Sequence, residues 1–155
     1  MDNKVQSQIR GAFDAIKEKS LSLRTSTVGQ RKKKLRKLHD WILKHRAAIQ
    51  EALHADLSKP KQESDLTVIL MVLSEIRKVN SSLKRWMKPK KEETSLTYMG
   101  TSAKTYYEPK GACLIIAPWN YPFQLAIGPL ISAIAAGNSV IVKPSEFSDH
   151  TSLLI

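Results

Sequence analysis

Three consecutive apolar segments near the end of the chain constrain its fold most strongly. Residues 112–117 (ACLIIA) show no polar alternation, which is typical of a strand buried on both faces of a parallel sheet. Residues 123–136 are long enough for a helix, with Pro122 suited to its first turn and Gly137 to its C-terminal cap. Residues 139–143 (SVIVK) are again β-branched. Together they predict a βαβ unit with the usual right-handed crossover.

Polar residues follow both predicted strands. Ligands of open parallel sheets bind beyond the carboxyl ends of the strands, which here carry residues 118–120 (PWN) and 143–146 (KPSE). An amide is therefore expected beside a Lys/Ser/Glu set on one edge. No GxGxxG dinucleotide fingerprint follows the first strand, so the residues alone predict a ligand-binding α/β edge.

Residues 108–146 resemble the start of the cofactor-binding domain in the aldehyde dehydrogenase superfamily, with PWNYP, AAGN and KPSE at the family's spacing. Residues 59–76 (KPKQESDLTVILMVLSEI) more loosely resemble a helical segment of its class 3-like branch. Members are considerably longer than this chain, which therefore corresponds to an amino-terminal portion.

The resemblance implies an α/β, aldehyde dehydrogenase-like fold. A helical N-terminal segment (1–92) and a β-hairpin of the oligomerisation type (93–108) would lead into residues 109–155. These would form the first βαβ unit of an incomplete Rossmann-like, NAD(P)-binding sheet. The hairpin implies a homodimer or higher homo-oligomer.

The implied reaction is NAD(P)-dependent oxidation of an aldehyde to a carboxylic acid through a cysteine thiohemiacetal and thioester. Asn120 would donate its amide to the aldehyde oxygen as negative charge develops there. Lys143 and Glu146 would contact the adenosine ribose, and a carboxylate there favours NAD over NADP, although class 3-like members accept both. By the same resemblance, the cofactor-binding set is Ile116, Ala117, Pro118, Trp119, Lys143, Ser145 and Glu146.

Two alternatives remain open at this level. A semialdehyde dehydrogenase or a coenzyme A-acylating enzyme of the same superfamily would share these motifs. A non-enzymatic basic module that binds nucleic acid is suggested by the charge, because residues 1–92 carry 22 Lys+Arg against 10 Asp+Glu. Yet the basic run 31–37 is interleaved with leucines at helical spacing and predicts the solvated face of an amphipathic helix, with no specific nucleic-acid site.

Cys113 is the only cysteine, and it falls inside the first predicted strand, where a buried thiol is inert. We therefore predict that it packs in the core, that the family's nucleophile and general base lie beyond Ile155, and that this chain alone is inactive. The four histidines lack metal-ligand spacing, so no metal site is expected. A single cysteine, no signal-peptide pattern and no long apolar run predict a cytoplasmic protein without a transmembrane segment.

Helical periodicity dominates the first 90 residues. A first helix is predicted around Ile9, Phe13 and Ile16, and a second over 28–55, with Thr27 and Gln30 as a capping box. A third is predicted over 64–87, with a buried stripe continued by Trp86. That stripe is Leu66, Ile69, Leu70, Leu73, Ile76, Val79 and Leu83.

Period-two alternation then predicts two strands, 94–98 and 103–107, around a turn at 100–102. Such an isolated hairpin needs a partner surface for stability.

Overall fold

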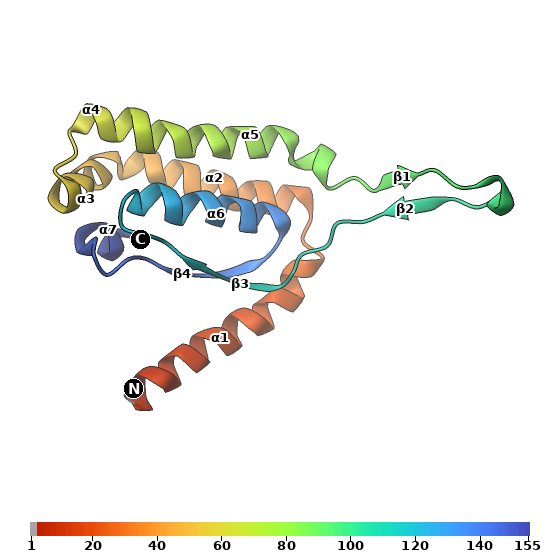
Figure 1. The fold of residues 1–155 in the computed structure, drawn as a ribbon, viewed down its shortest axis with the longest axis horizontal. Coiled ribbons are helices and arrows are strands. Elements are labelled where there is room, and N and C mark those ends of the chain that lie inside the picture. The colour runs from red at the N-terminus through yellow and green to blue at the C-terminus, as the bar shows by residue number, and fades with distance from the viewer. Residues whose placement is uncertain (1–2) are drawn as a thin grey trace.

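The front of the chain folds into helices, as its apolar periodicity predicts, and the computed structural model describes residues 3–155 (Figure 1). The helices are α1 (Asn3–Arg24), α2 (Val28–Lys44), α3 (Arg46–Leu57), α4 (Lys61–Ser64) and α5 (Leu70–Trp86). Thr27 caps α2 through the predicted capping box, accepting from the Gln30 N–H while the Gln30 side chain accepts from the Thr27 N–H. None of the described helices combines the length and apolar character needed to cross a bilayer.

The predicted helix over 28–55 is wrong in its continuity, because it breaks at His45 into α2 and α3. The His45 backbone leaves the helical region, at φ −102° and ψ 18°. Its ring stacks on Trp41 at a centroid distance of 4.3 Å, and its Nδ1 lies 2.8 Å from the Trp41 carbonyl oxygen. The side chain thus competes for the backbone group at the helix end, without the Pro or Gly that usually marks such a break.

The third helix contains a π-helical turn, Asp65–Ile69, between α4 and α5. A π turn shifts the side-chain phase, so the predicted stripe does not stay on one face. Its later members are buried as predicted, but Leu66 and Leu70 are exposed, and the prediction is wrong for these two. Trp86, predicted to extend the stripe into the core, is also exposed at the end of α5.

Helix α1 extends away from the helical body, and its N-terminal half projects freely (Figure 1). Its predicted apolar residues Ile9 and Phe13 are exposed for this reason. The C-terminal half contacts the sheet, where Ser139 Oγ donates a 2.6 Å hydrogen bond to the Ile16 carbonyl.

The hairpin exists, but its first strand lies earlier than predicted. Strand β1 (Lys90–Glu92) pairs antiparallel with β2 (Ala103–Thr105), with Lys90 opposite Thr105. Residues 96–98, predicted as strand, form a 3₁₀ turn instead. The hairpin projects from the body as an arm (Figure 1).

The βαβ unit has the predicted limits to within one residue. Strand β3 (Ala112–Ile116), helix α6 (Pro122–Ala136) and strand β4 (Ser139–Lys143) follow one another, and the strands pair in parallel. Helix α6 ends at Gly137, whose φ of 88° is the left-handed cap expected there. A short helix, α7 (Asp149–Leu154), follows and packs on α3.

Helix α6 joins the helical layer to the sheet, because it contacts α2 and α5 as well as both parallel strands. The hydrophobic core forms around it from the inward faces of α2, α3, α5 and α6. Its fully buried side chains include Leu35, Ile42, Ile49, Leu53, Ile76, Phe123 and Ile131.

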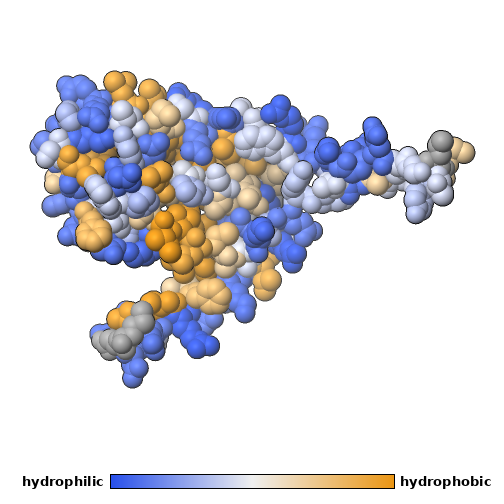
Figure 2. All heavy atoms as spheres, viewed as in Figure 1, coloured by the Kyte–Doolittle hydropathy of each residue, from blue (hydrophilic) through white to orange (hydrophobic). Residues whose placement is uncertain are grey.

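One face of the two-stranded sheet is open, so the prediction of a strand buried on both faces is wrong within these residues. Leu114 and Ile116 are 62% and 69% exposed, and Cys113, predicted to pack in the core, is half-buried. Helix α6 covers one face of the sheet, while the C-terminal half of α1 contacts it near Gly111 and Ser139. Figure 2 shows hydrophobic side chains exposed between the helical body and α1, where β3 and β4 run in Figure 1.

The basic run departs from its prediction most clearly at Arg31. Lys33, Lys34, Arg36 and Lys37 are exposed, as a solvated helix face requires, but Arg31 is only 6% exposed. Its guanidinium turns inward to the end of α6, where it donates to the Ala135 carbonyl.

Candidate active site

The carboxyl ends of β3 and β4 lie side by side. Ile116 is directly opposite Lys143, and the Ala117 N–H donates a 3.0 Å hydrogen bond to the Lys143 carbonyl. The two predicted strand-end segments, 118–120 and 143–146, therefore lie at the same edge of the sheet. The structure brings together the residues that follow the two strands.

Asn120 lies in a bend between β3 and α6 and is exposed. Pro122 and Phe123 hold the loop from the helix side, because both are buried in the first turn of α6. Ala117 is buried at the strand side, whereas Pro118 and Trp119 are exposed. An exposed amide on a loop anchored at both ends can meet a ligand without a large rearrangement.

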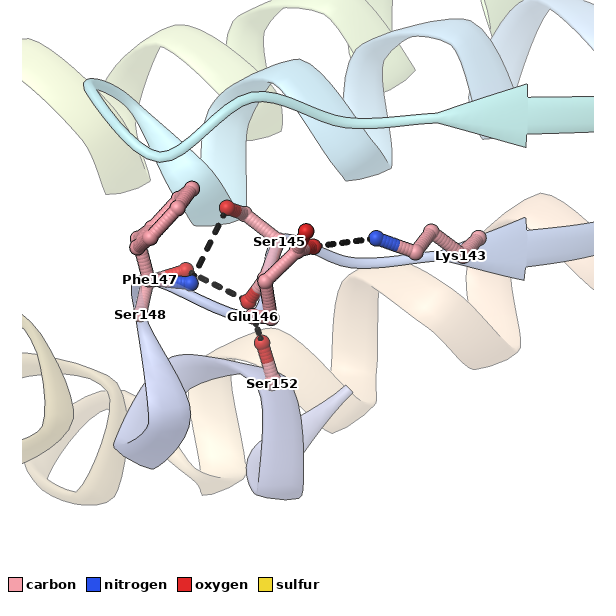
Figure 3. Close-up of polar contacts among 6 residues, drawn as sticks. All are labelled: Lys143, Ser145, Glu146, Phe147, Ser148 and Ser152. Carbon is pink, nitrogen blue, oxygen red and sulfur yellow. Dashed lines mark hydrogen bonds and ion pairs between the residues drawn. The ribbon is translucent and has the colours of Figure 1, made fainter.

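Lys143 and Glu146 form an ion pair at the end of β4 and in the turn that follows it (Figure 3). Both side chains are more than half exposed, so solvent screens the pair. The hydrogen bond from Lys143, supported by a backbone N–H, holds the pKa of Glu146 below its ordinary value. Glu146 is therefore an ionised acceptor and Lys143 a donor, both open to solvent.

Ser145 differs from its neighbours because it is only 5% exposed. Its Oγ accepts from the Phe147 N–H at 3.2 Å, and its carbonyl accepts from the Ser152 hydroxyl at 2.6 Å (Figure 3). The Ser148 hydroxyl and N–H also donate hydrogen bonds to the Ser145 carbonyl, each at 3.3 Å. The serine side chain thus shapes the turn that presents Lys143 and Glu146.

Ser148 and Ser152 were not among the predicted site residues. The sequence pattern that could have identified them is the spacing of the serines at positions 145, 148 and 152. This spacing places the three residues on one side of a turn and of the helix that follows it. Asp56 also supports this region from α3, accepting from the His150 and Thr151 N–H groups at 3.0 and 2.8 Å. The edge is therefore fixed from outside the βαβ unit as well.

The amino ends of the strands are fixed by Gly111 and Asn138. The Gly111 N–H donates to Asn138 Oδ1 at 2.9 Å, and the Ser139 N–H donates to the Gly111 carbonyl at 3.0 Å. Gly111 has a φ of 113°, which favours glycine. These contacts set the register that aligns Ile116 with Lys143.

Cys113 lies away from the edge, opposite Val140 in the middle of β3. Within residues 3–155, no group of three His, Cys, Asp or Glu side chains is arranged to hold a metal ion.

The parallel βαβ edge carries PWN and KPSE at its strand ends, and these are the residues on which the resemblance to aldehyde dehydrogenases rests. A family model for the aldehyde dehydrogenase family matches residues 1–155, and the chain belongs to that family. Its fold is the aldehyde dehydrogenase fold, since it superposes on the substrate-bound AldH of Staphylococcus aureus with a TM-score of 0.89. That match has 42% identity and covers 92% of this chain and 31% of the other.

Class 3 members are among the relatives. Aldehyde dehydrogenase family 3 member H1 of Arabidopsis thaliana is 44% identical over 72% of this chain and 23% of its own length. A structure of 1-pyrroline-5-carboxylate dehydrogenase from Thermus with bound NAD shares the fold, with 22% identity and a TM-score of 0.80, covering 92% of this chain and 27% of the other. The chain spans about a third of the length of the curated relatives it matches.

Proposed function

We propose that this chain provides the oxyanion donor and part of the adenosine site of an enzyme that oxidises an aldehyde to a carboxylic acid. The observation that carries this proposal is the pairing of Ile116 with Lys143, which places Asn120 and the Lys143–Glu146 turn beyond neighbouring strand ends. Membership of the aldehyde dehydrogenase family supports the reaction class.

Asn120 is the catalytic residue of this proposal. Its side-chain N–H donates to the aldehyde oxygen, on which negative charge develops when a cysteine thiolate attacks the carbonyl carbon. Such a donor stabilises the transition state more than the ground state, by about 3–4 kcal/mol. The loop suits this task because buried Ala117 and Pro122 anchor it on either side of the amide.

The residues at this edge suit a nicotinamide dinucleotide, and they favour NAD over NADP. Lys143 and Glu146 are exposed, with a donor and an ionised acceptor suited to ribose hydroxyls, and Ser145 braces their turn. Ile116, Ala117, Pro118 and Trp119 supply the apolar wall, in which Ile116 and Trp119 are exposed. When bound, the nicotinamide accepts a hydride. The Glu146 carboxylate repels a 2′-phosphate, which disfavours NADP without excluding it.

The projecting hairpin is proposed as a homo-oligomer contact. It presents unpaired strand edges, and Tyr98, Met99, Tyr106 and Tyr107 are exposed on it and at its base. An isolated two-stranded hairpin is marginal in water, so a second copy of the chain would stabilise it.

The direct test replaces Asn120 by Ala in the enzyme that contains this segment together with its nucleophilic cysteine. We expect kcat to fall about 10²–10³-fold, because one oxyanion donor is lost, while the KM for NAD stays unchanged. A kcat within about threefold of the wild type would exclude the oxyanion role. Residues 1–155 alone should not oxidise aldehydes, because their only cysteine is Cys113, in the middle of β3.

A further inference from the structure

Lys59 is a buried lysine close to the candidate site. It follows Ser58, whose φ of 52° ends α3, and it lies before α4. Only 8% of Lys59 is exposed, whereas lysines are almost never buried unless their charge is paired. A buried ammonium in a tight turn therefore requires partners that offset its desolvation.

Two partners meet the Lys59 ammonium. Its Nζ lies 3.1 Å from Glu63 Oε1, one helical turn along the chain. It also lies 4.4 Å from the ring centroid of Tyr121, within the range of a cation–π contact. The first contact is local, whereas the second joins the α3–α4 turn to the loop after β3.

Tyr121 connects Asn120 to the first turn of α6. It is the N-cap residue of α6, with a non-helical backbone at φ −138° and ψ 64°, and no side-chain hydrogen bond caps this helix. Its carbonyl accepts the Leu125 N–H at 2.9 Å. A restraint on the Tyr121 ring therefore acts on the residue next to the Asn120 amide and on the first turn of α6.

We propose that Lys59 is a positioning residue for Asn120, acting through its cation–π contact with Tyr121. The catalytic meaning of this inference rests on the proposed function, but the positioning itself can be tested on residues 1–155. The cation–π contact requires both the Lys59 charge and the Tyr121 ring face, so either residue can be substituted to remove it. If Lys59 only filled space, the Asn120 amide would not respond to the loss of the charge or of the ring.

The first comparison removes the charge. Lys59→Met keeps a chain of similar length without the cation, Lys59→Arg keeps the cation, and the exposed Lys61→Met is the matched control. Nuclear magnetic resonance would follow the Asn120 side-chain amide signals and the hydrogen exchange of the Leu125 N–H. We expect Lys59→Met to broaden or shift the Asn120 signals and to speed Leu125 exchange about tenfold. Lys59→Arg and Lys61→Met should remain close to the wild type.

The second comparison removes the ring. Tyr121→Phe keeps the aromatic face and should behave as the wild type, whereas Tyr121→Leu should reproduce the Lys59→Met spectrum. The double variant Lys59→Met/Tyr121→Leu should add nothing to either single change, because both remove one contact. This comparison also covers the case in which Lys59→Met unfolds the chain. Unchanged Asn120 signals in Tyr121→Leu, or fully additive effects in the double variant, would overturn the inference.

Measurements of enzyme activity distinguish the positioning role of Lys59 from the oxyanion role of Asn120. In the enzyme with its nucleophile, Lys59→Met should lower kcat about tenfold with an unchanged KM for NAD, and Lys59→Arg should restore it. If Lys59→Met disorders Asn120 but Asn120→Ala retains full activity, the positioning is supported and the oxyanion role is overturned.

Discussion

The Arg31 guanidinium donates a 3.0 Å hydrogen bond to the Ala135 carbonyl, 104 positions away, and closes the C-terminal end of α6. Its Nε also donates to Ser26 Oγ at 2.9 Å, so the side chain is fixed from two directions. Burial lowers the pKa of this guanidinium from its ordinary value, because desolvation disfavours the charged form. A cation at the negative end of a helix partly offsets that cost.

This contact predicts that Gly137→Ala destabilises the chain. A Cβ at Gly137 would lie 2.5 Å from an Arg31 nitrogen and 2.6 Å from its guanidinium carbon, and the φ of 88° disfavours a side chain. We expect the free energy of unfolding to fall by about 2 kcal/mol or more, as measured by urea denaturation. Gly11→Ala is the matched control, because a Cβ added there would meet nothing within 4 Å beyond its chain neighbours and the backbone of α1 itself, and Ala favours helix. Equal stability of the two variants would contradict both the close contact with Arg31 and the cost of a side chain at this φ.

The Glu75 carboxylate predicts a pH dependence. Desolvation raises its pKa, and Lys78 offsets this only in part. A pKa raised in the folded state stabilises the fold below the unfolded value, near 4.5, and this contribution is lost as the pH rises through the folded pKa. Glu75→Gln should therefore be more stable than the wild type at pH 7, with the difference shrinking toward pH 4. Thermal unfolding across this range would measure it, and a constant difference would count against the desolvated carboxylate.

The strand-end turn predicts selective binding of an adenosine nucleotide to residues 1–155. Lys143→Met and Glu146→Gln should each weaken AMP binding about tenfold, because a hydrogen bond to a charged group is lost. Glu146→Gln should also narrow the preference for AMP over adenosine 2′,5′-bisphosphate, since the repelling carboxylate is removed. The exposed Lys110→Met is the control. Nuclear magnetic resonance titration gives the affinities, and unmoved signals at 143–146 would exclude this site.

The open face of the sheet predicts self-association of residues 1–155. Leu114 and Ile116 expose apolar side chains on β3, and contact between copies would remove them from water. Leu114→Lys should raise the dissociation constant of the associated chains about tenfold or more, because the free energy of burying one leucine is lost. Leu21→Lys changes an exposed leucine on α1 and serves as the control. A strictly monomeric sedimentation profile for the wild type would contradict this prediction.

Local signals determined the elements around the site. The limits of the βαβ unit are set by local residues, because Pro122 fits the first turn of α6 and Gly137 accepts the positive φ that ends it. The capping box of Thr27 and Gln30 is likewise a contact between near neighbours. Two strands joined through a helix pair in parallel, so residues 117–120 and 143–146 meet at one edge of the sheet.

Two departures from the predicted periodicity lie within single segments: the His45 ring stacks on Trp41, four residues earlier, and the π turn at 65–69 moves Leu66 and Leu70 out of the predicted stripe. Tertiary contacts instead decided the burial of charged side chains. Arg31 reads locally as one more cation on a solvated face, yet it is buried because the end of α6 offers it a carbonyl. Lys59 gains its ring partner in the same way. The sequence by itself determined the elements of the βαβ unit and the edge at which they end, since their limits depend on near neighbours. Only the tertiary structure decided that Arg31 and Lys59 are buried, because Ala135 and Tyr121 lie far from them along the chain.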